Sequence, residues 1–201
     1  MARPKQGDGP TADERIERAF FEVLDQTPFD KLTVSAIVKA AGVNRNSFYY
    51  HYADLDDLAQ SAVSNVLVPE VPRLIANGFG LESEQVNQAF QEAVGDDRLN
   101  RVPLIMGVNS SPVLRQMLKD AFIELWFDVF GLAREDLRPE EFLTVHYVLG
   151  GMLEVIGQLQ GTEFVEYLRM IRSLEVVQTS ARIVMATLGA AAERAAEPPK
   201  S

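Results

Sequence analysis

Apolar residues recur at helical spacing along most of the chain, and no segment shows the strict alternation of apolar and polar residues that marks a strand. Glycine, serine and proline residues interrupt the pattern at Gly95, at residues 110–112, at Gly131 and at Gly161. Beyond residue 80, the periodic segments are residues 83–94, 97–107, 111–131, 139–157 and 162–188. The pattern predicts an all-α protein.

A further helix is predicted near the N-terminus. Thr11 and Glu14 have the spacing of a capping box, which begins this helix, and Pro28 ends it. Its apolar positions are Ile16, Ala19, Phe20, Val23 and Leu24. They share one face, so the helix should pack on the two short helices that follow.

Residues 33–52 have the pattern of two short helices joined by a tight turn. The apolar face of the first helix consists of Val34, Ile37, Val38 and Ala41. Thr33 precedes it as the expected N-cap, Gly42 supplies the permissive backbone of the turn, and Asn44 is the expected N-cap of the second helix. Helix, glycine-containing turn and helix in this order form a helix-turn-helix.

The second short helix has an unusual exposed side. Phe48 and Tyr52 share one face and should be buried. The opposite arc has no carboxylate and consists of Arg45, Asn46, Ser47, Tyr49, Tyr50 and His51. Arg and Asn can contact base edges in a bidentate manner, while hydroxyl and imidazole groups suit phosphates. The alternative is a small helical subdomain whose tyrosines merely cover the core.

Residues 42–52, GVNRNSFYYHY, followed by Asp57 and Leu58, resemble the DNA-binding signature of the tetracycline-repressor (TetR) family of bacterial regulators. The resemblance extends over about residues 12–65. It implies that Arg45, Asn46 and Ser47 face DNA bases, and that Thr33, Tyr49, Tyr50 and His51 hold the DNA backbone. The predicted DNA-binding residues are therefore Thr33, Lys39, Asn44, Arg45, Asn46, Ser47, Tyr49, Tyr50 and His51.

One position departs from the family pattern. The resemblance implies a lysine at the start of the next helix, where it would contact a phosphate, and this chain has Leu55 there. The loss of one such contact should weaken DNA binding and reduce its salt dependence, without changing which sequence is read.

Composition limits the function. The 201 residues are 47% hydrophobic, and the net charge of −10 means that DNA binding must depend on where charges lie. The chain has no cysteine and only two histidines, and it lacks nucleotide-binding and nucleophile motifs. We therefore predict no enzyme activity, metal or cofactor. Neither a signal-peptide pattern nor an apolar run near 18 residues is present, so we expect a cytoplasmic protein without a membrane partner.

The predicted organisation is a Pro/Gly-rich disordered arm over residues 1–10, a helix-turn-helix domain over residues 11–53, a larger helical ligand-binding and dimerisation domain over residues 54–189, and a frayed tail over residues 190–201. Arg3 and Lys5 form either a minor-groove arm or a solvated tail. Asp54 should cap the next helix. Pro69 and Pro72 should end or kink it, as a hinge or as an ordinary break.

The helices predicted over residues 139–157 and 162–188 have more apolar surface than one buried face requires. Paired with their copies they would form a four-helix dimer interface, which the TetR family also uses. The alternative is that both are core helices of a monomer. The predicted interface residues are Phe142, Leu149, Gly150, Leu153, Gly157, Val177, Ala181, Val184 and Leu188. A homodimer would hold two reading helices roughly 34–36 Å apart on a pseudo-palindromic site.

An aromatic cluster in the central segments is a candidate pocket for a small molecule. Its members are Phe79, Met106, Asn109, Phe122, Trp126, Phe130, His146 and Tyr147. The alternative is that they are plain core, with His146 a core histidine.

Three functional hypotheses follow from these features. The first is a dimeric repressor that binds a double-stranded DNA operator and is released by a small-molecule effector. The second is a DNA-binding regulator that responds to a protein partner or is constitutive. The third is a helical enzyme or structural protein that retains the N-terminal domain. The carboxylate-free helix and the family resemblance favour the first.

Overall fold

The fold is given by a computed structural model that describes residues 9–95, 97–158 and 164–197. The described part of the chain is built from helices and has no strand, which confirms the predicted all-α class. The α-helices are α1 (Ala12–Gln26), α2 (Val34–Ala41), α3 (Arg45–His51), α4 (Leu55–Asn65), α5 (Glu70–Ala76), α6 (Glu84–Gly95), α7 (Val102–Met106), α8 (Pro112–Phe130), α9 (Pro139–Gly157), α10 (Phe164–Ser173) and α11 (Glu175–Ala196). Short 3-10 turns are η1 (Phe29–Lys31), η2 (Leu99–Arg101) and η3 (Arg134–Asp136).

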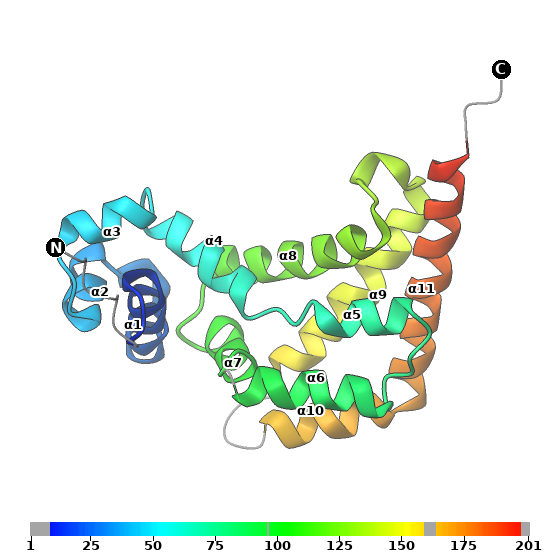
Figure 1. Cartoon of the computed structure of the whole chain (residues 1–201), viewed down its shortest axis with the longest axis horizontal. Coiled ribbons are helices and arrows are strands. Elements are labelled where there is room, and N and C mark those ends of the chain that lie inside the picture. The colour runs from blue at the N-terminus through cyan, green and yellow to red at the C-terminus, as the bar shows by residue number, and fades with distance from the viewer. Residues whose placement is uncertain (1–8, 96, 159–163, 198–201) are drawn as a thin grey trace, which may run out of the picture.

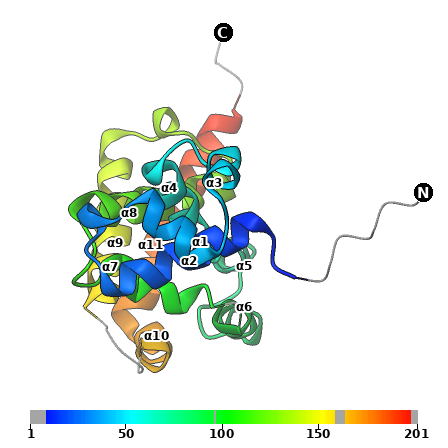
Figure 2. The same ribbon diagram turned by 90° about the vertical axis from the view of Figure 1, so that its left-hand side faces the viewer.

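The helices form an N-terminal head of α1–α3 and a larger body of α5–α11 (Figure 1). Helix α4 runs from the head into the body, where it packs against α8. Helix α11 lies along the edge of the body opposite the head, beside α9. Figure 2 views the molecule from the head side and shows the head in front of the body.

The head is held together by a small aromatic and aliphatic core. The Glu14 carboxylate accepts the Thr11 N–H at 2.8 Å, as the predicted capping box requires. Phe20 contacts Phe21 and Phe29 edge-on, with ring centroids 5.1 Å and 6.4 Å apart. The fully buried side chains of the head come from all three of its helices and are Ile16, Phe20, Leu24, Ile37 and Phe48. The core therefore fixes α3 rigidly against α1.

The connection from head to body breaks where the prolines predict. Helix α4 ends at Asn65, and α5 begins at Glu70 directly after Pro69. Pro72 lies in the first turn of α5, where backbone N–H groups have no acceptor within the helix, so the lack of an N–H in proline costs no hydrogen bond. The sequence predicted this break but not the short helix α5 that follows it.

The last predicted helix is two helices, which corrects the single segment expected over residues 162–188. Helix α10 ends at Ser173, whose hydroxyl donates to the Met170 carbonyl at 2.8 Å, and Leu174 adopts an extended backbone (φ −68°, ψ 131°) before α11 begins. Apolar residues on both sides of Leu174 keep helical spacing, so the periodic pattern alone does not reveal that the helix is interrupted there.

The tail from residue 190 is helical as far as Ala196, contrary to the expectation of fraying. Ala191 is fully buried, and both Nη atoms of Arg194 donate to the Glu141 carboxylate, at 2.6 Å and 2.8 Å. This ion pair ties the end of α11 to the start of α9. Residues 1–8, with Arg3 and Lys5, and residues 198–201 lie outside the described part of the chain.

Candidate nucleic-acid interface

Local capping interactions place α3 at the surface of the head. The Thr33 hydroxyl accepts the Ala36 N–H at 3.2 Å, and the Asn44 side-chain oxygen accepts the Ser47 N–H at 2.8 Å. Between the two helices, Gly42 adopts φ 62° and ψ 34°, a left-handed conformation that costs glycine no steric strain. The turn therefore closes as the sequence predicts, and α2 and α3 form a helix-turn-helix.

Helix α3 has one buried and one exposed face. Phe48 is fully buried and Tyr52, just after the helix, is almost so. The Phe48 ring lies edge-on to Tyr49 at 5.4 Å, while Tyr49 keeps 51% and Tyr50 85% of its surface exposed. Arg45, Asn46 and His51 are exposed and Ser47 is half-buried. The helix thus presents amide, guanidinium, imidazole and phenol groups to solvent without a carboxylate.

Tyr52 anchors the end of α3 to the adjoining helix. Its phenol hydrogen-bonds with Ser61 of α4, and burial raises the pKa of Tyr52 above its usual value. The phenol therefore stays neutral throughout the physiological range.

Thr33 is the N-cap of α2, Lys39 lies on α2 and Asn44 is the N-cap of α3, and all three residues are exposed. Capping uses the side-chain oxygen of Asn44, so its NH₂ group can donate to another acceptor, such as a phosphate. The structure thus brings all nine predicted DNA-binding residues to the helix-turn-helix, with Ser47 the least exposed of those on α3.

Two of the acidic residues that follow α3, Asp54 and Asp57, accept backbone hydrogen bonds. Asp54 accepts the Asp57 N–H at 2.9 Å, and Asp57 accepts the Ala53 N–H at 2.8 Å. Both carboxylates thus interact with the positive end of the α4 dipole rather than with the exposed face of α3. Leu55, where the resemblance implies lysine, is half-buried against the core.

A cluster of polar contacts joins the head to the body. Glu17 of α1 is buried, and its two carboxylate oxygens accept Nη1 of Arg101 at 2.8 Å and Nδ2 of Asn65 at 2.6 Å. The Arg101 guanidinium also lies 4.9 Å from the ring centroid of Phe21. Neither Glu17 nor Arg101 was predicted from the sequence, although the carboxylate of Glu17 inside the apolar stripe of the first helix is a signal that could have identified it.

A second contact between head and body uses Asn109, which the sequence analysis assigned to the pocket. Its backbone carbonyl accepts the Phe29 N–H, and its side-chain NH₂ donates to the Asp25 carbonyl, both at 2.8 Å. The side chain of Asn109 is therefore used at the head and not in the body.

The body contains an apolar cavity of about 140 Å³. Phe122 and Trp126 of α8 line it, together with Leu99 and Val102, the residues on either side of the Asn100–Arg101 pair. The wall also contains Arg172 of α10. Within the described residues, the buried Trp126 Nε1 and Arg172 Nε have no hydrogen-bond partner. The cavity thus combines an apolar lining with two unsatisfied donors.

The other predicted pocket residues do not gather at this cavity. Phe79 lines a separate surface depression, and Met106 packs against Gly157. Phe130 is half-buried, and Tyr147 is 85% exposed. His146 stacks on Phe142 with ring centroids 3.9 Å apart, and burial lowers the pKa of His146. Helix α9 turns residues 146 and 147 away from Trp126, so spacing along the sequence did not identify the shared wall.

Most residues predicted for the dimer interface lie in the core of the single chain. Leu149, Leu153, Ala181, Val184 and Leu188 are buried where α9 and α11 pack together. Arg134 covers the ring of Phe142, Gly150 faces Lys119, Gly157 faces Met106, and Val177 is half-buried. The most apolar stripe of each helix is its core stripe, and a second apolar stripe is exposed.

That second stripe runs along α9 and α11. Its large exposed side chains are Leu143, Tyr147 and Val155 on α9 and Val176 and Ile183 on α11. Added methyl groups at Gly151 and Gly189 would meet no other atom within 4 Å. Both helices therefore have apolar surface that their own chain does not cover.

Residues 18–62 match the family model described as bacterial regulatory proteins, tetR family. The chain is 25% identical over 141 residues to YxbF of Bacillus subtilis (strain 168), an uncharacterised HTH-type transcriptional regulator. That alignment covers 67% of this chain but only 36% of YxbF, so the chain spans about a third of the length of this relative. The crystal structure of Mycobacterium smegmatis AmtR is 20% identical, covering 98% of this chain and 100% of AmtR with a TM-score of 0.39.

Two further observations concern other kinds of site. Among the described residues, no helix is both long and apolar enough to span a membrane. The same residues contain no group of three or more His, Cys, Asp or Glu side chains arranged to hold a metal ion.

Proposed function

Because this chain belongs to the TetR family of bacterial transcriptional regulators, we propose that it is a repressor that binds a pseudo-palindromic DNA operator as a homodimer and is released by a small ligand. The observation that carries the proposal is the exposed face of α3, which is rich in donors, free of carboxylates and fixed to a rigid core.

Each group on that face suits one part of a DNA duplex. Arg45 and Asn46 lie at the start of α3, the end that enters the major groove in helix-turn-helix proteins. Their side chains can read base edges in a bidentate manner. Tyr49, Tyr50 and His51 offer donors for phosphate oxygens, and Thr33, Lys39 and Asn44 extend this set along the backbone.

The exposed stripe of α9 and α11 supports the dimer. Leu143 and Val176 are 65% and 67% exposed, an unusual amount for large apolar side chains unless a partner covers them. Helix α11 lies along the edge of the body away from the head, so a second copy that packed on α11 would leave both α3 helices free (Figure 1). Two copies would form the four-helix arrangement of a C₂ dimer.

The cavity and the head–body contact support a ligand response. Leu99 and Val102 line the cavity, and Arg101 between them holds Glu17 of α1. A ligand that pushed these two side chains outward would shift Arg101 and so move the head relative to the body. Rigid-body rotation of one domain against another is a known way in which proteins change conformation when a ligand binds.

Operator binding by variants of α3 tests the proposal. We expect Arg45→Ala and Tyr49→Ala each to lose binding to DNA flanking the gene for this protein in an electrophoretic mobility shift assay, with the dimer intact by sedimentation. Arg182→Ala on α11 is the matched control, since it removes an exposed arginine far from α3. Normal binding by both α3 variants would refute the assignment of the surface.

A further inference from the structure

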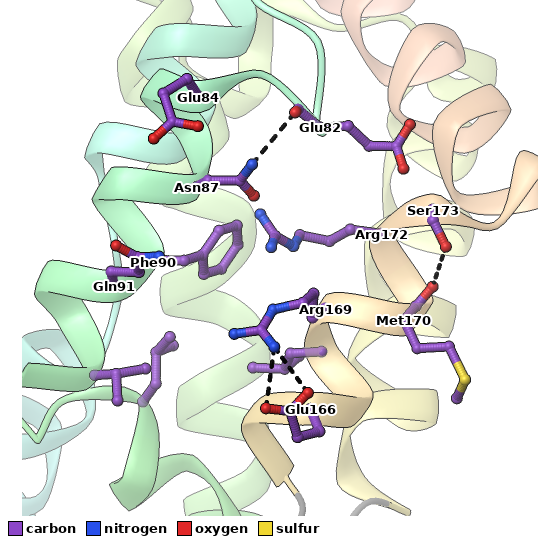
Figure 3. A pocket seen from close by; sticks show the side chains of 13 residues that line it. Glu82, Glu84, Asn87, Phe90, Gln91, Glu166, Arg169, Met170, Arg172 and Ser173 are labelled. Carbon is purple, nitrogen blue, oxygen red and sulfur yellow. Dashed lines mark hydrogen bonds and ion pairs between the residues drawn. The ribbon is translucent and has the colours of Figure 1, made fainter.

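Arg172 has a half-buried guanidinium that forms no salt bridge with the described residues. It lies over the ring of Phe90, with its central carbon 4.4 Å from the ring centroid, and makes one long hydrogen bond of 3.5 Å to the Leu81 carbonyl (Figure 3). Within the described part of the chain, no ion pair joins it to a carboxylate. Burying a cation without a counter-charge is costly, and burial lowers the pKa of Arg172.

The neighbouring Arg169 provides a contrast. Its guanidinium donates to both oxygens of Glu166, at 2.8 Å and 3.0 Å, on the surface of the same helix (Figure 3). The nearby Glu82 carboxylate accepts Nε2 of Gln178 at 2.9 Å. Glu82 and Glu166 therefore each accept hydrogen bonds from other side chains, and Arg172 retains an unused Nε donor.

Arg172 also lies at the boundary between two spaces. It lines the apolar cavity, and it lines an open pocket of about 730 Å³ between α6 and α10 that reaches solvent (Figure 3). A ligand entering through the open pocket would meet the guanidinium at the mouth of the cavity. Its charged end would stay at this mouth while its apolar part moved inward.

The interior limits the size of that apolar part. A cavity of about 140 Å³ is close to the roughly 150 Å³ that accommodates benzene in an apolar protein cavity. Its lining residues are aliphatic and aromatic apart from Arg172. One aromatic ring or a chain of about six carbons therefore fits, and a larger body does not.

The mouth limits the charge of the ligand. Glu82, Glu84 and Glu166 line the open pocket with the two arginines, so a dianion would be repelled more strongly than a monoanion. A carboxylate carries one negative charge and matches the two-pronged geometry of a guanidinium.

We propose that the cavity binds a small monocarboxylate, with an apolar part about the size of one benzene ring inside the cavity and its carboxylate on Arg172. This inference rests on the proposed function, in that the monocarboxylate would be the ligand that releases the operator.

The single tryptophan of the chain makes the test direct, because it lines the cavity. Benzoate and hexanoate are titrated into the full-length protein at pH 7 while tryptophan fluorescence is recorded, with benzamide and hexanamide as uncharged matches of similar shape. We expect each carboxylate to bind about tenfold or more tightly than its amide, as a charge-assisted hydrogen bond predicts.

Two variants locate the effect. Arg172→Gln should abolish the preference for carboxylate over amide, while Arg169→Gln, which removes the already paired arginine on the same helix, should preserve it. Melting temperatures within a few degrees of wild type show that both variants are folded. The inference is overturned if neither carboxylate changes the fluorescence, if acid and amide bind equally, or if Arg172→Gln keeps the preference.

Operator binding is measured on the same samples, so that failure of this inference is separate from failure of the proposed function. A protein that binds its operator but no carboxylate overturns the inference and leaves a DNA-binding regulator. A protein that binds carboxylates through Arg172 but no DNA supports the site and overturns the proposed function.

Discussion

The ion pair between Glu17 and Arg101 should couple the head to the body, and Arg101→Met tests this directly. The two side chains keep only 11% and 17% of their surface exposed, and Nη1 of Arg101 lies 2.8 Å from Oε1 of Glu17. The variant keeps much of the apolar stem of Arg101 but leaves the Glu17 carboxylate buried with Asn65 as its remaining donor. Removal of one partner from a buried pair costs about 3–5 kcal/mol.

Two features place this variant near the lower limit of that range. Asn65 continues to donate to Glu17, and both side chains are slightly exposed to solvent. We therefore expect a loss of about 3 kcal/mol in the free energy of unfolding. In a chain of this length, such a loss corresponds to a fall of about 6–12 °C in melting temperature.

The assay is a double-mutant cycle by chemical denaturation, with Glu17→Leu, Arg101→Met and the double variant. The double variant removes both charges, so it should cost at least about 1.5 kcal/mol less than the sum of the single variants. Arg169→Met, which breaks an exposed pair with Glu166, is the control and should change stability by less than about 1 kcal/mol. Single effects that add to within about 0.5 kcal/mol would refute the coupling.

Three further predictions concern other parts of the molecule. Leu55→Lys should tighten binding to every duplex and increase the number of counterions released on binding by about one. That number is measured as the slope of log affinity against log salt concentration, and an unchanged slope would show that residue 55 lies away from the phosphates. Ile183→Glu should dissociate the dimer in sedimentation experiments while Ile183→Leu preserves it, and an intact Ile183→Glu dimer would exclude this face of α11. Burial lowers the pKa of His146, so the unfolded state takes up its proton first as pH falls below about 6.5, and the free energy of unfolding should decline there. His146→Gln should flatten this decline, and equal pH profiles for wild type and His146→Gln would contradict the burial argument.

The head could be predicted from sequence because its determinants are local. The caps at Thr33 and Asn44 and the left-handed turn at Gly42 each depend on residues within a few positions. The burial of Phe48 and the exposure of Tyr50 follow from helical spacing alone. The same reasoning gave the positions of α6, α8 and α9.

The features that were missed depend on contacts between distant parts of the chain. Glu17 and Arg101 are 84 residues apart, as are Asp25 and Asn109, and no local pattern pairs them. The sequence does show two apolar stripes on α9, but it does not show which stripe the chain covers itself. Leu149 was therefore assigned to a partner and Tyr147 to a pocket, although Leu149 is buried and Tyr147 is exposed.

A nuclease footprint on the DNA upstream of the gene for this protein, at low salt, tests the central claim most directly. We expect two protected half-sites about one helical turn apart, related by an approximate dyad, and loss of both with Asn46→Ala. Absence of protection with wild-type protein, or an unchanged footprint with Asn46→Ala, would contradict the claim that α3 reads DNA.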